Sequence, residues 1–378
     1  MKRRTFPRAV WLAAAGLLLA GWVHGGQITD RIWLKGRKEP HLGQISGESI
    51  DGVKVGLATF SITGIVRIQY GDAPFAFREA EQHREQGRYE EATRLYETAL
   101  RDKLMQRRWW LDPNCKYKIA LCHLGQDEYD DAVKAFQKVL GEHKDSRWTP
   151  DAILGLGEVY FEQKKYNNAI QQFDALAKLA AAKNFEEWQL RATLWKAKAL
   201  RANKNPDDAL RLIQQIVDTG QGGKYGDIVI AARTEQAVIL MAKGQNNKAV
   251  DLLQKLIQEI APSVAQEIGD GSETSNQRIE ATCFNTLGRC YLQMASKAGD
   301  AKKKESLHYE ALLSFLWNVV LYQRLPAVHA EALFYAAQCF EKLNQRTRAT
   351  ELRNELVQRY PDSTFARQVR PEGRGAGN

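Results

Sequence analysis

The stretch that decides the fold is residues 156–173, LGEVYFEQKKYNNAIQQF. Gly157 and Ala169 are small residues twelve positions apart, and a large apolar residue follows each of them, Tyr160 after the first and Phe173 after the second. Spacings of three and four residues are typical of one face of an α-helix. The polar residues between the two segments indicate a turn. The stretch therefore predicts two antiparallel helices whose close crossing requires the small side chains.

The same pattern recurs along the chain from residue 75 to residue 363. An Ala suited to the second small position occurs seven times, and in six of these units the residue twelve positions earlier is Ala or Gly. In the other unit Gly288 precedes Ala311 by 23 residues, which places an insertion around Lys297–His308. The six regular pairs are Ala80/Ala92, Ala120/Ala132, Gly157/Ala169, Ala197/Ala209, Ala237/Ala249 and Ala337/Ala349.

These small pairs, the large residue four positions after most of the second ones, and the final Tyr360-Pro361-Asp362-Ser363 resemble the tetratricopeptide-repeat (TPR) family, in particular bacterial exported or envelope TPR proteins. The resemblance implies a mainly α fold, a TPR-like helical-hairpin solenoid of about seven helix pairs. The units are spaced more widely than the 34 residues of the family, and HEAT-like helical repeats have a period near 40, so that alternative stays open.

Residues 26–72 have a different pattern. Apolar and polar residues alternate in short runs separated by glycines, which is typical of antiparallel strands. We expect four or five strands in a small SH3-like or Sm-like barrel, with a thin core that leans on the following helices. The runs are Ile32/Leu34, Val53/Val55/Leu57 and Val66/Ile68/Tyr70. The expected domains are a signal peptide at 1–25, the β segment at 26–72, the TPR solenoid at 73–365 and a disordered tail at 366–378.

The first 25 residues have the three parts of a secretory signal peptide. Four basic residues between Lys2 and Arg8 precede an apolar run from Ala9 to Val23, and a cleavage site follows at Gly25. We expect export to the periplasm or cell envelope, with no membrane span after cleavage. The run is shorter than the roughly 20 residues of a membrane span, and an uncleaved inner-membrane signal anchor is the alternative.

Composition and motifs argue against several functions. The formal charge of +9 includes four positive charges in the first 25 residues, and acids and bases alternate along the helices, so nucleic-acid binding is disfavoured. No pattern of a nucleophile with its base or of metal ligands is found. We therefore expect no enzyme, no cofactor and no metal site.

The cysteines fall at small, half-buried positions of the repeats, where we expect them to serve as small apolar residues. Two cysteines seven residues apart on one helix are too distant for a disulfide. A bond between Cys290 and Cys339 is the alternative left open. The five are Cys115, Cys122, Cys283, Cys290 and Cys339.

A partner is expected on the face formed by the first helices of the repeats, which lines a groove in TPR proteins. The groove positions hold aromatic, aliphatic and basic residues, and aromatic residues and Arg dominate binding energies at interfaces. They are Tyr117, Leu121, Leu154, Phe161, Trp195, Lys198, Arg201, Met241 and Arg289. The resulting hypothesis is a protein–protein interaction scaffold of the bacterial cell envelope that binds a protein or peptide segment of apolar and acidic character.

Two alternatives to this site stay open. The groove residues can instead pack against long neighbouring helices and leave no groove. The basic groove residues and the tail can instead bind a polyanion, either nucleic acid or an acidic envelope polymer, and such binding would weaken steeply with salt. The sequence does not determine the oligomeric state.

Overall fold

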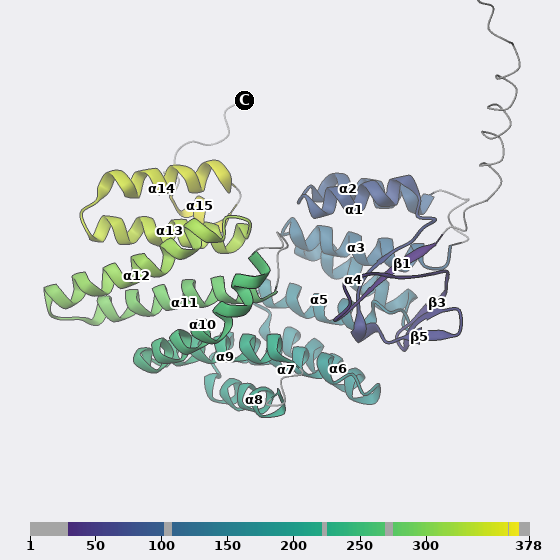
Figure 1. The fold of residues 1–378 in the computed structure, drawn as a ribbon, viewed down its shortest axis with the longest axis horizontal. Helices are drawn as coiled ribbons and strands as arrows, with labels where there is room; N and C mark the ends of the chain where they lie inside the picture. The colour runs from purple at the N-terminus through teal and green to yellow at the C-terminus, as the bar shows by residue number, and fades with distance from the viewer. Residues whose placement is uncertain (1–28, 102–107, 221–224, 269–274, 362, 370–378) are drawn as a thin grey trace, which may run out of the picture. The chain divides into compact units, whose positions relative to one another are not determined.

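The structure is a computed structural model, described here for residues 29–101, 108–220, 225–268, 275–361 and 363–369 (Figure 1). The expected signal peptide and residues 370–378 of the expected tail lie outside these ranges. The chain divides into two compact units, one up to Ala152 and one from Ile153. Within the described ranges, no helix has the length and apolar character needed to cross a membrane.

The first unit begins with six strands in two antiparallel three-stranded sheets. One sheet has the order β2-β1-β6 and the other β3-β4-β5. In the first sheet Ile32 of β1 pairs with His41 of β2 and with Ile68 of β6. The strands are β1 (Asp30–Leu34), β2 (His41–Gly43), β3 (Ile45–Ser49), β4 (Gly52–Val55), β5 (Ala58–Phe60) and β6 (Ile65–Gln69).

The small β segment is present as expected, but it has six strands instead of four or five, arranged in two three-stranded sheets. Leu57 is fully exposed because β4 ends at Val55 and Gly56, with φ +59°, turns the chain into β5. Val66 is 65% exposed. The pairing of β1 with β6 shifts register at Leu34, and Ile65 and Ile68 are the half-buried residues of β6.

The β segment shares one apolar core with the first helices, as expected for a segment this small. Ile32 and Val53 are fully buried in the same cluster as Phe77 and Tyr96 of the first helix pair. Tyr70, just after β6, stacks on Trp110 with ring centroids 3.7 Å apart and an angle of 2° between the planes. The strands therefore depend on the helices for most of their burial.

Seven helix pairs follow, and a short helix ends the described chain (Figure 1). The first unit holds α1 (Phe75–Glu85), α2 (Tyr89–Arg101), α3 (Leu111–Gly125) and α4 (Tyr129–Glu142); α5 (Thr149–Glu162) begins in it. The second unit continues with α6 (Tyr166–Ala182), α7 (Glu186–Ala202), α8 (Pro206–Thr219), α9 (Gly226–Ala242), α10 (Asn246–Ile268), α11 (Ser275–Lys297), α12 (Ala301–Leu321), α13 (Pro326–Lys342), α14 (Arg346–Arg359) and α15 (Thr364–Val369).

The small positions predicted from the sequence lie where the two helices of each pair cross. Every Ala of the six regular pairs is at most 1% exposed. A Cβ atom on Gly157 would lie 2.4 Å from a ring carbon of Phe173, so the second helix of that pair approaches as closely as glycine permits. The seven helix pairs of the predicted solenoid are confirmed.

Six of the seven pairs turn through the same backbone conformation. The residue two positions before the second helix has φ between +59° and +75°, as at Gly87, Asp127 and Gly244. The next residue donates its N–H to a carbonyl five residues earlier, for example from Gln245 to Leu240 at 2.9 Å. This is the helix-ending motif that favours glycine or a polar residue in the left-handed region.

The pair with the insertion turns differently. Its eleven extra residues lengthen the helices, so that α11 has 23 residues and α12 has 21. The Asp300 carboxylate accepts the N–H of Lys303 at 2.7 Å and thereby caps α12. The inserted polar stretch is therefore mainly helical.

Two further expectations concern the C-terminus and the cysteines. Residues 366–369, assigned to the tail from the sequence, belong to α15. Ser363 caps this helix by accepting the N–H of Ala366 at 3.0 Å, and Ala366 is buried against α13 and α14. All five cysteines are buried as free thiols, so the alternative disulfide between Cys290 and Cys339 is not formed.

Candidate functional site

The structure brings three of the predicted groove residues of the second unit into one cluster. Leu154, Phe161 and Trp195 are all half-buried around Phe173. The Trp195 ring lies 5.9 Å from the ring of Phe161 and 5.9 Å from that of Phe173, stacked on the latter. Part of the Trp195 side chain is therefore buried between helices, and the rest is accessible at the face of α5 and α7.

Two basic residues lie one and two turns further along α7. The Lys198 ammonium lies 4.2 Å from the centroid of the Trp195 ring, a cation–π contact. Burial lowers the pKa of Lys198, although the carboxylates of Glu235 and Glu158 act in the opposite direction. The guanidinium of Arg201 forms a salt bridge with Glu235, which lies on α9 and is 6% exposed.

The same pairing of charges is found further along the repeats. Arg289 donates to Glu331 of α13 at 3.1 Å, and the Asn285 amide reaches the same carboxylate at 3.0 Å. Met241 is half-buried against the apolar core. Arg201 and Arg289 thus already have acidic partners within the protein, which reduces their value as a basic strip for a polyanion.

The two predicted residues of the first unit differ from those of the second. Tyr117 is 8% exposed and stacks on Trp148, with centroids 4.4 Å apart. Leu121, one turn further along α3, is half-buried. Tyr117 therefore has a packing role, as in the alternative in which groove positions pack against neighbouring helices.

An exposed apolar surface lies elsewhere in the second unit, on α12. Five side chains at spacings of four, four, three and one residues form a stripe about 18 Å long, at 1.5 Å per residue. They are Tyr309 (43% exposed), Leu313 (57%), Trp317 (52%), Val320 (65%) and Leu321 (49%). A contiguous apolar surface of this kind typically marks a protein interaction site.

Sequence reasoning missed this α12 stripe because α12 is apolar on two faces. Ala311, Leu312 and Phe315 are buried in the core of the second unit, and their period is the one that the repeat pattern follows. The residues of the outer face have the same helical period, so periodicity alone does not separate core from surface. The signal was present in Tyr309 and Trp317, which no repeat position requires.

A pocket of about 400 Å³ lies in the first unit beside β6, between α1 and α3. Its charged walls are already paired: Lys118 lies 3.3 Å from Glu81, and Arg147 donates to Glu48 at 2.9 Å. Burial lowers the pKa of Lys118, and the Lys118 and Arg84 cations outweigh burial and lower the pKa of Glu81. The Arg147–Glu48 pair thus joins the β segment to the chain just before α5, while the buried Trp148 Nε1 beside the pocket has no hydrogen-bond partner within the described structure.

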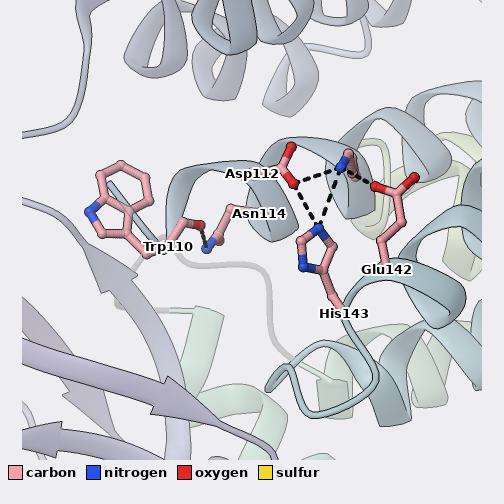
Figure 2. Close-up of polar contacts among 6 residues, drawn as sticks. Trp110, Asp112, Asn114, Glu142 and His143 are labelled. Atoms are coloured by element: carbon pink, nitrogen blue, oxygen red, sulfur yellow. Dashed lines mark hydrogen bonds and ion pairs between the residues drawn. The ribbon is translucent and has the colours of Figure 1, made fainter. Parts of the chain in front are cut away.

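Three potential metal ligands meet where α3 begins and α4 ends (Figure 2). The Asp112 and His143 side chains point toward each other, 2.8 Å apart. Lys116 lies among them, with its ammonium 2.6 Å from Asp112 and 3.5 Å from His143 and paired with Glu142. Burial opposes the charge of Lys116, but the hydrogen bonds that it donates to Asp112 and Glu142 raise its pKa. The lysine therefore supplies the cation that this cluster requires.

Comparison with known proteins agrees with the fold. Residues 117–184 and 331–363 match two models described as tetratricopeptide repeat. A tetratricopeptide repeat protein from Parabacteroides merdae is similar in structure, with a TM-score of 0.51, 10% identity, and coverage of 78% of this chain and 95% of that one. No curated protein sequence matches the chain.

Two further solved structures are similar at lower scores. Human IFIT1, as a dimer with PPP-AAAA, has a TM-score of 0.48 and 14% identity over 77% of this chain. The match spans 61% of the length of IFIT1. NprR in complex with its cognate peptide NprX has a TM-score of 0.45 and 11% identity, and the match covers 78% of this chain and 80% of that one.

None of these matches indicates a catalytic family. At such identities a solved structure is evidence for the fold alone. Residues 117–184 and 331–363 thus match tetratricopeptide repeats, and the Parabacteroides protein shares the fold.

Proposed function

We propose that this chain is a protein–protein interaction scaffold, as TPR-like folds generally are, and that it has two docking surfaces in its second unit. The α12 stripe is the observation that carries the proposal. Leu313 and Val320 are 57% and 65% exposed on a helix whose opposite face is buried. Water contact with so much apolar surface is unfavourable, and a partner with an apolar helix face would remove it.

The second docking surface is the face predicted from the sequence, where Phe161, Trp195 and Lys198 lie together. An aromatic pair beside a cation suits a segment with an apolar side chain next to a carboxylate. Leu154, Arg201 and Met241 border this face. Tyr117, Leu121 and Arg289 are left out of this surface, because Tyr117 and Leu121 lie in the first unit and Arg289 is paired with Glu331.

The experiment compares variants of the two surfaces in capturing partners from envelope extract. Leu313→Glu/Val320→Glu places charges on the α12 stripe without touching the core. Leu42→Glu is the matched control, because Leu42 is 59% exposed on β2 in the first unit. We expect the stripe variant to lose, by at least tenfold, a partner that the wild type and the control retain.

The same extract tests the second surface with Phe161→Ala/Trp195→Ala. A partner that the Phe161→Ala/Trp195→Ala variant fails to capture, and that the α12 variant still captures, would dock on the face of α5 and α7. Equal capture by all variants would refute both surfaces. A sedimentation measurement on the purified wild type and α12 variant shows whether the partner is a second copy of the chain.

The alternative function, binding of a polyanion by basic groove residues and tail, has less support because Arg201 and Arg289 are paired. Polyanion binding would fall steeply between 50 and 200 mM salt, whereas apolar docking would not. Capture of nucleic acid or an acidic polymer that is lost at 200 mM salt would favour the alternative.

The proposal includes export to the bacterial envelope, with 26–72 and 73–365 as the parts of the mature protein. Its support is the basic and apolar pattern of the first 25 residues. Mass spectrometry of the protein from a cell fractionation tests this: a periplasmic protein starting at Gly26 is expected, and an intact cytoplasmic chain would refute it.

A further inference from the structure

A second pocket, of about 460 Å³, lies in the second unit beside the start of α10. Its walls come from three places in the chain: the α9–α10 turn with the first residues of α10, the end of α11, and the first half of α12. The volume is in the range of small-molecule sites, about 300 to 1,000 Å³. The pocket is distinct from the α12 stripe and from the face of α5 and α7.

The insertion found in the sequence brings α11 and α12 to this pocket. Lys297 is the last residue of α11 and Lys303 lies in the first turn of α12, both within the inserted stretch. The Lys297 ammonium lies 3.6 Å from the point where a Cβ of Gly244 would stand. Gly244 is the left-handed residue of the α9–α10 turn, so the lysine reaches directly over that turn.

The charge of the pocket is of one sign. Lys248, Lys297 and Lys303 line it, and no carboxylate is among the described residues that do so. The three lysines are exposed, and within the described part of the chain none of them forms a salt bridge. Three unpaired ammonium groups around one hollow repel one another, and a bound anion would relieve this repulsion.

The start of α10 adds a second attraction for an anion. Asn246, Asn247 and Lys248 are the first residues of this helix, and their N–H groups have no acceptor within it. The partial positive charge at a helix N-terminus, together with these free N–H groups, binds phosphate groups in many proteins. The lysines and the helix thus act on the same volume.

An unsatisfied side chain in the wall points independently to a ligand. Asn246 lines the pocket and is 6% exposed, and its amide oxygen has no hydrogen-bond partner within the described structure. A buried polar atom without a partner is costly. The oxygen is closed off from water in the ligand-free chain, so a ligand hydroxyl would satisfy it once the Asn246 side chain turns into the pocket.

We propose that this pocket binds the phosphate group of a small molecule. Lysine binds phosphate as a point charge, and three lysines with a helix N-terminus carry more positive charge than is needed to neutralise a phosphate dianion. The pocket is larger than the phosphate itself, which leaves room for the group that carries it. The site does not depend on the proposed docking surfaces, since none of its residues lies in them.

The test uses the full chain, inorganic phosphate and glycerol 3-phosphate, with glycerol and sodium chloride of equal ionic strength as blanks. Calorimetric titration gives the Kd, and thermal unfolding gives the shift of Tm, which rises with any ligand that binds only the folded state. We expect both phosphates to bind and to raise Tm, and we expect glycerol and chloride to do neither.

Lys297→Gln/Lys303→Gln should weaken phosphate binding at least tenfold. Lys255→Gln, at an exposed lysine further along α10, is the matched control and should bind as the wild type does. Asn246→Ala should also weaken binding, but it should not lower the Tm of the ligand-free protein, because it removes an unsatisfied group. Circular dichroism confirms that each variant folds.

The outcomes separate clearly. No binding of either phosphate by the wild type, or equal binding by the wild type and the double lysine variant, would overturn the proposal. Equal loss in the Lys255 control would do the same, since it would reveal general charge attraction. If inorganic phosphate binds and glycerol 3-phosphate does not, the ligand is the free phosphate ion and not a phosphate group carried by a small molecule.

Discussion

The ring of Phe315 occupies the space that a side chain at Gly288 would need. A Cβ atom on Gly288 would lie 2.5 Å from Cζ of Phe315 and 2.7 Å from Cε2. Gly157 and Phe173 have the same relationship six helices earlier, at 2.4 Å. At both repeat positions where the small residue is glycine, the facing phenylalanine ring fills the space of the missing side chain. The eleven-residue insertion between Gly288 and Ala311 does not change this contact.

Gly288→Ala should therefore destabilise the protein, although alanine favours helix. Replacing a helical glycine normally gains about 0.5 to 1 kcal/mol. Overpacking a core costs about 1 to 3 kcal/mol, and ring carbons at 2.5 Å make the upper part of that range the better guide. We expect a net loss of roughly 1 kcal/mol or more in urea unfolding.

Gly141→Ala is the control for this prediction, because nothing lies within 4 Å of its Cβ position in α4. It should leave stability unchanged or raise it. Adding Phe315→Leu to Gly288→Ala should recover part of the loss. Equal stability of the two single alanine variants would show that the helices separate easily at this crossing.

The fold was predictable because its determinants are local and repeated. Small residues twelve positions apart, such as Gly157 and Ala169, indicate that two helices cross closely, and the residues of the turns indicate a left-handed backbone conformation. The β segment was less predictable. The turn at Gly56 and the register shift at Leu34 decide which apolar residues face inward. The alternation of apolar and polar residues along a single strand predicts neither of these two features.

The candidate site was predictable only in part. Phe161, Trp195 and Lys198 do lie together, because repeat positions determine which helix face a residue occupies. The salt bridges of Arg201 and Arg289 to acids on other helices depend on side-chain geometry that a single sequence does not give. The pocket at Asn246 combines three separated segments, and only the insertion indicated that something unusual stood there.

The five thiols should be unreactive in the folded protein. Burial raises the pKa of Cys339 to about 12 and those of Cys283 and Cys290 to about 11. A thiol with a pKa near 11 is about 0.1% thiolate at pH 8, and the thiolate is the reactive form. A disulfide exchange reagent at pH 8 should detect no thiols in the native state and five in guanidinium. Rapid labelling of a native cysteine would contradict its burial.

Glu280 should make the protein less stable at neutral pH than in mild acid. Its side chain is in a residue 6% exposed, and burial raises its pKa above the ordinary value, while the hydrogen bond from Tyr322 opposes the shift. A raised pKa in the folded state stabilises the protein below about pH 4.3, and this contribution is lost as pH rises through the folded pKa. Glu280→Gln keeps an acceptor for Tyr322 and removes the charge.

Glu280→Gln should therefore raise Tm at pH 7, and its advantage over the wild type should shrink as pH falls toward 4. Thermal unfolding followed by circular dichroism across this range measures both. Glu305→Gln, at an exposed position of α12, should not change the pH dependence. A lower Tm for Glu280→Gln at pH 7 would mean that the ionised carboxylate is favourable where it lies.

Arg147 and Glu48 should be strongly coupled, because their salt bridge is buried and joins residues 99 positions apart. Arg147 Nε donates to Glu48 Oε2 at 2.9 Å, the side chains are 12% and 5% exposed, and the guanidinium lies 3.8 Å from the centroid of the Trp148 ring. Arg147→Met leaves a buried carboxylate without its cation, which costs about 3 to 5 kcal/mol. Glu48→Gln/Arg147→Met removes both charges and should cost less than the sum of the single variants, with a coupling of about 0.5 to 3 kcal/mol.

The exposed pair of Arg94 and Glu90 is the control, and Arg94→Met should change stability by about 0.5 kcal/mol at most. If urea unfolding gave Arg147→Met a loss as small as that, the β segment would not be held to the first helices through this bridge.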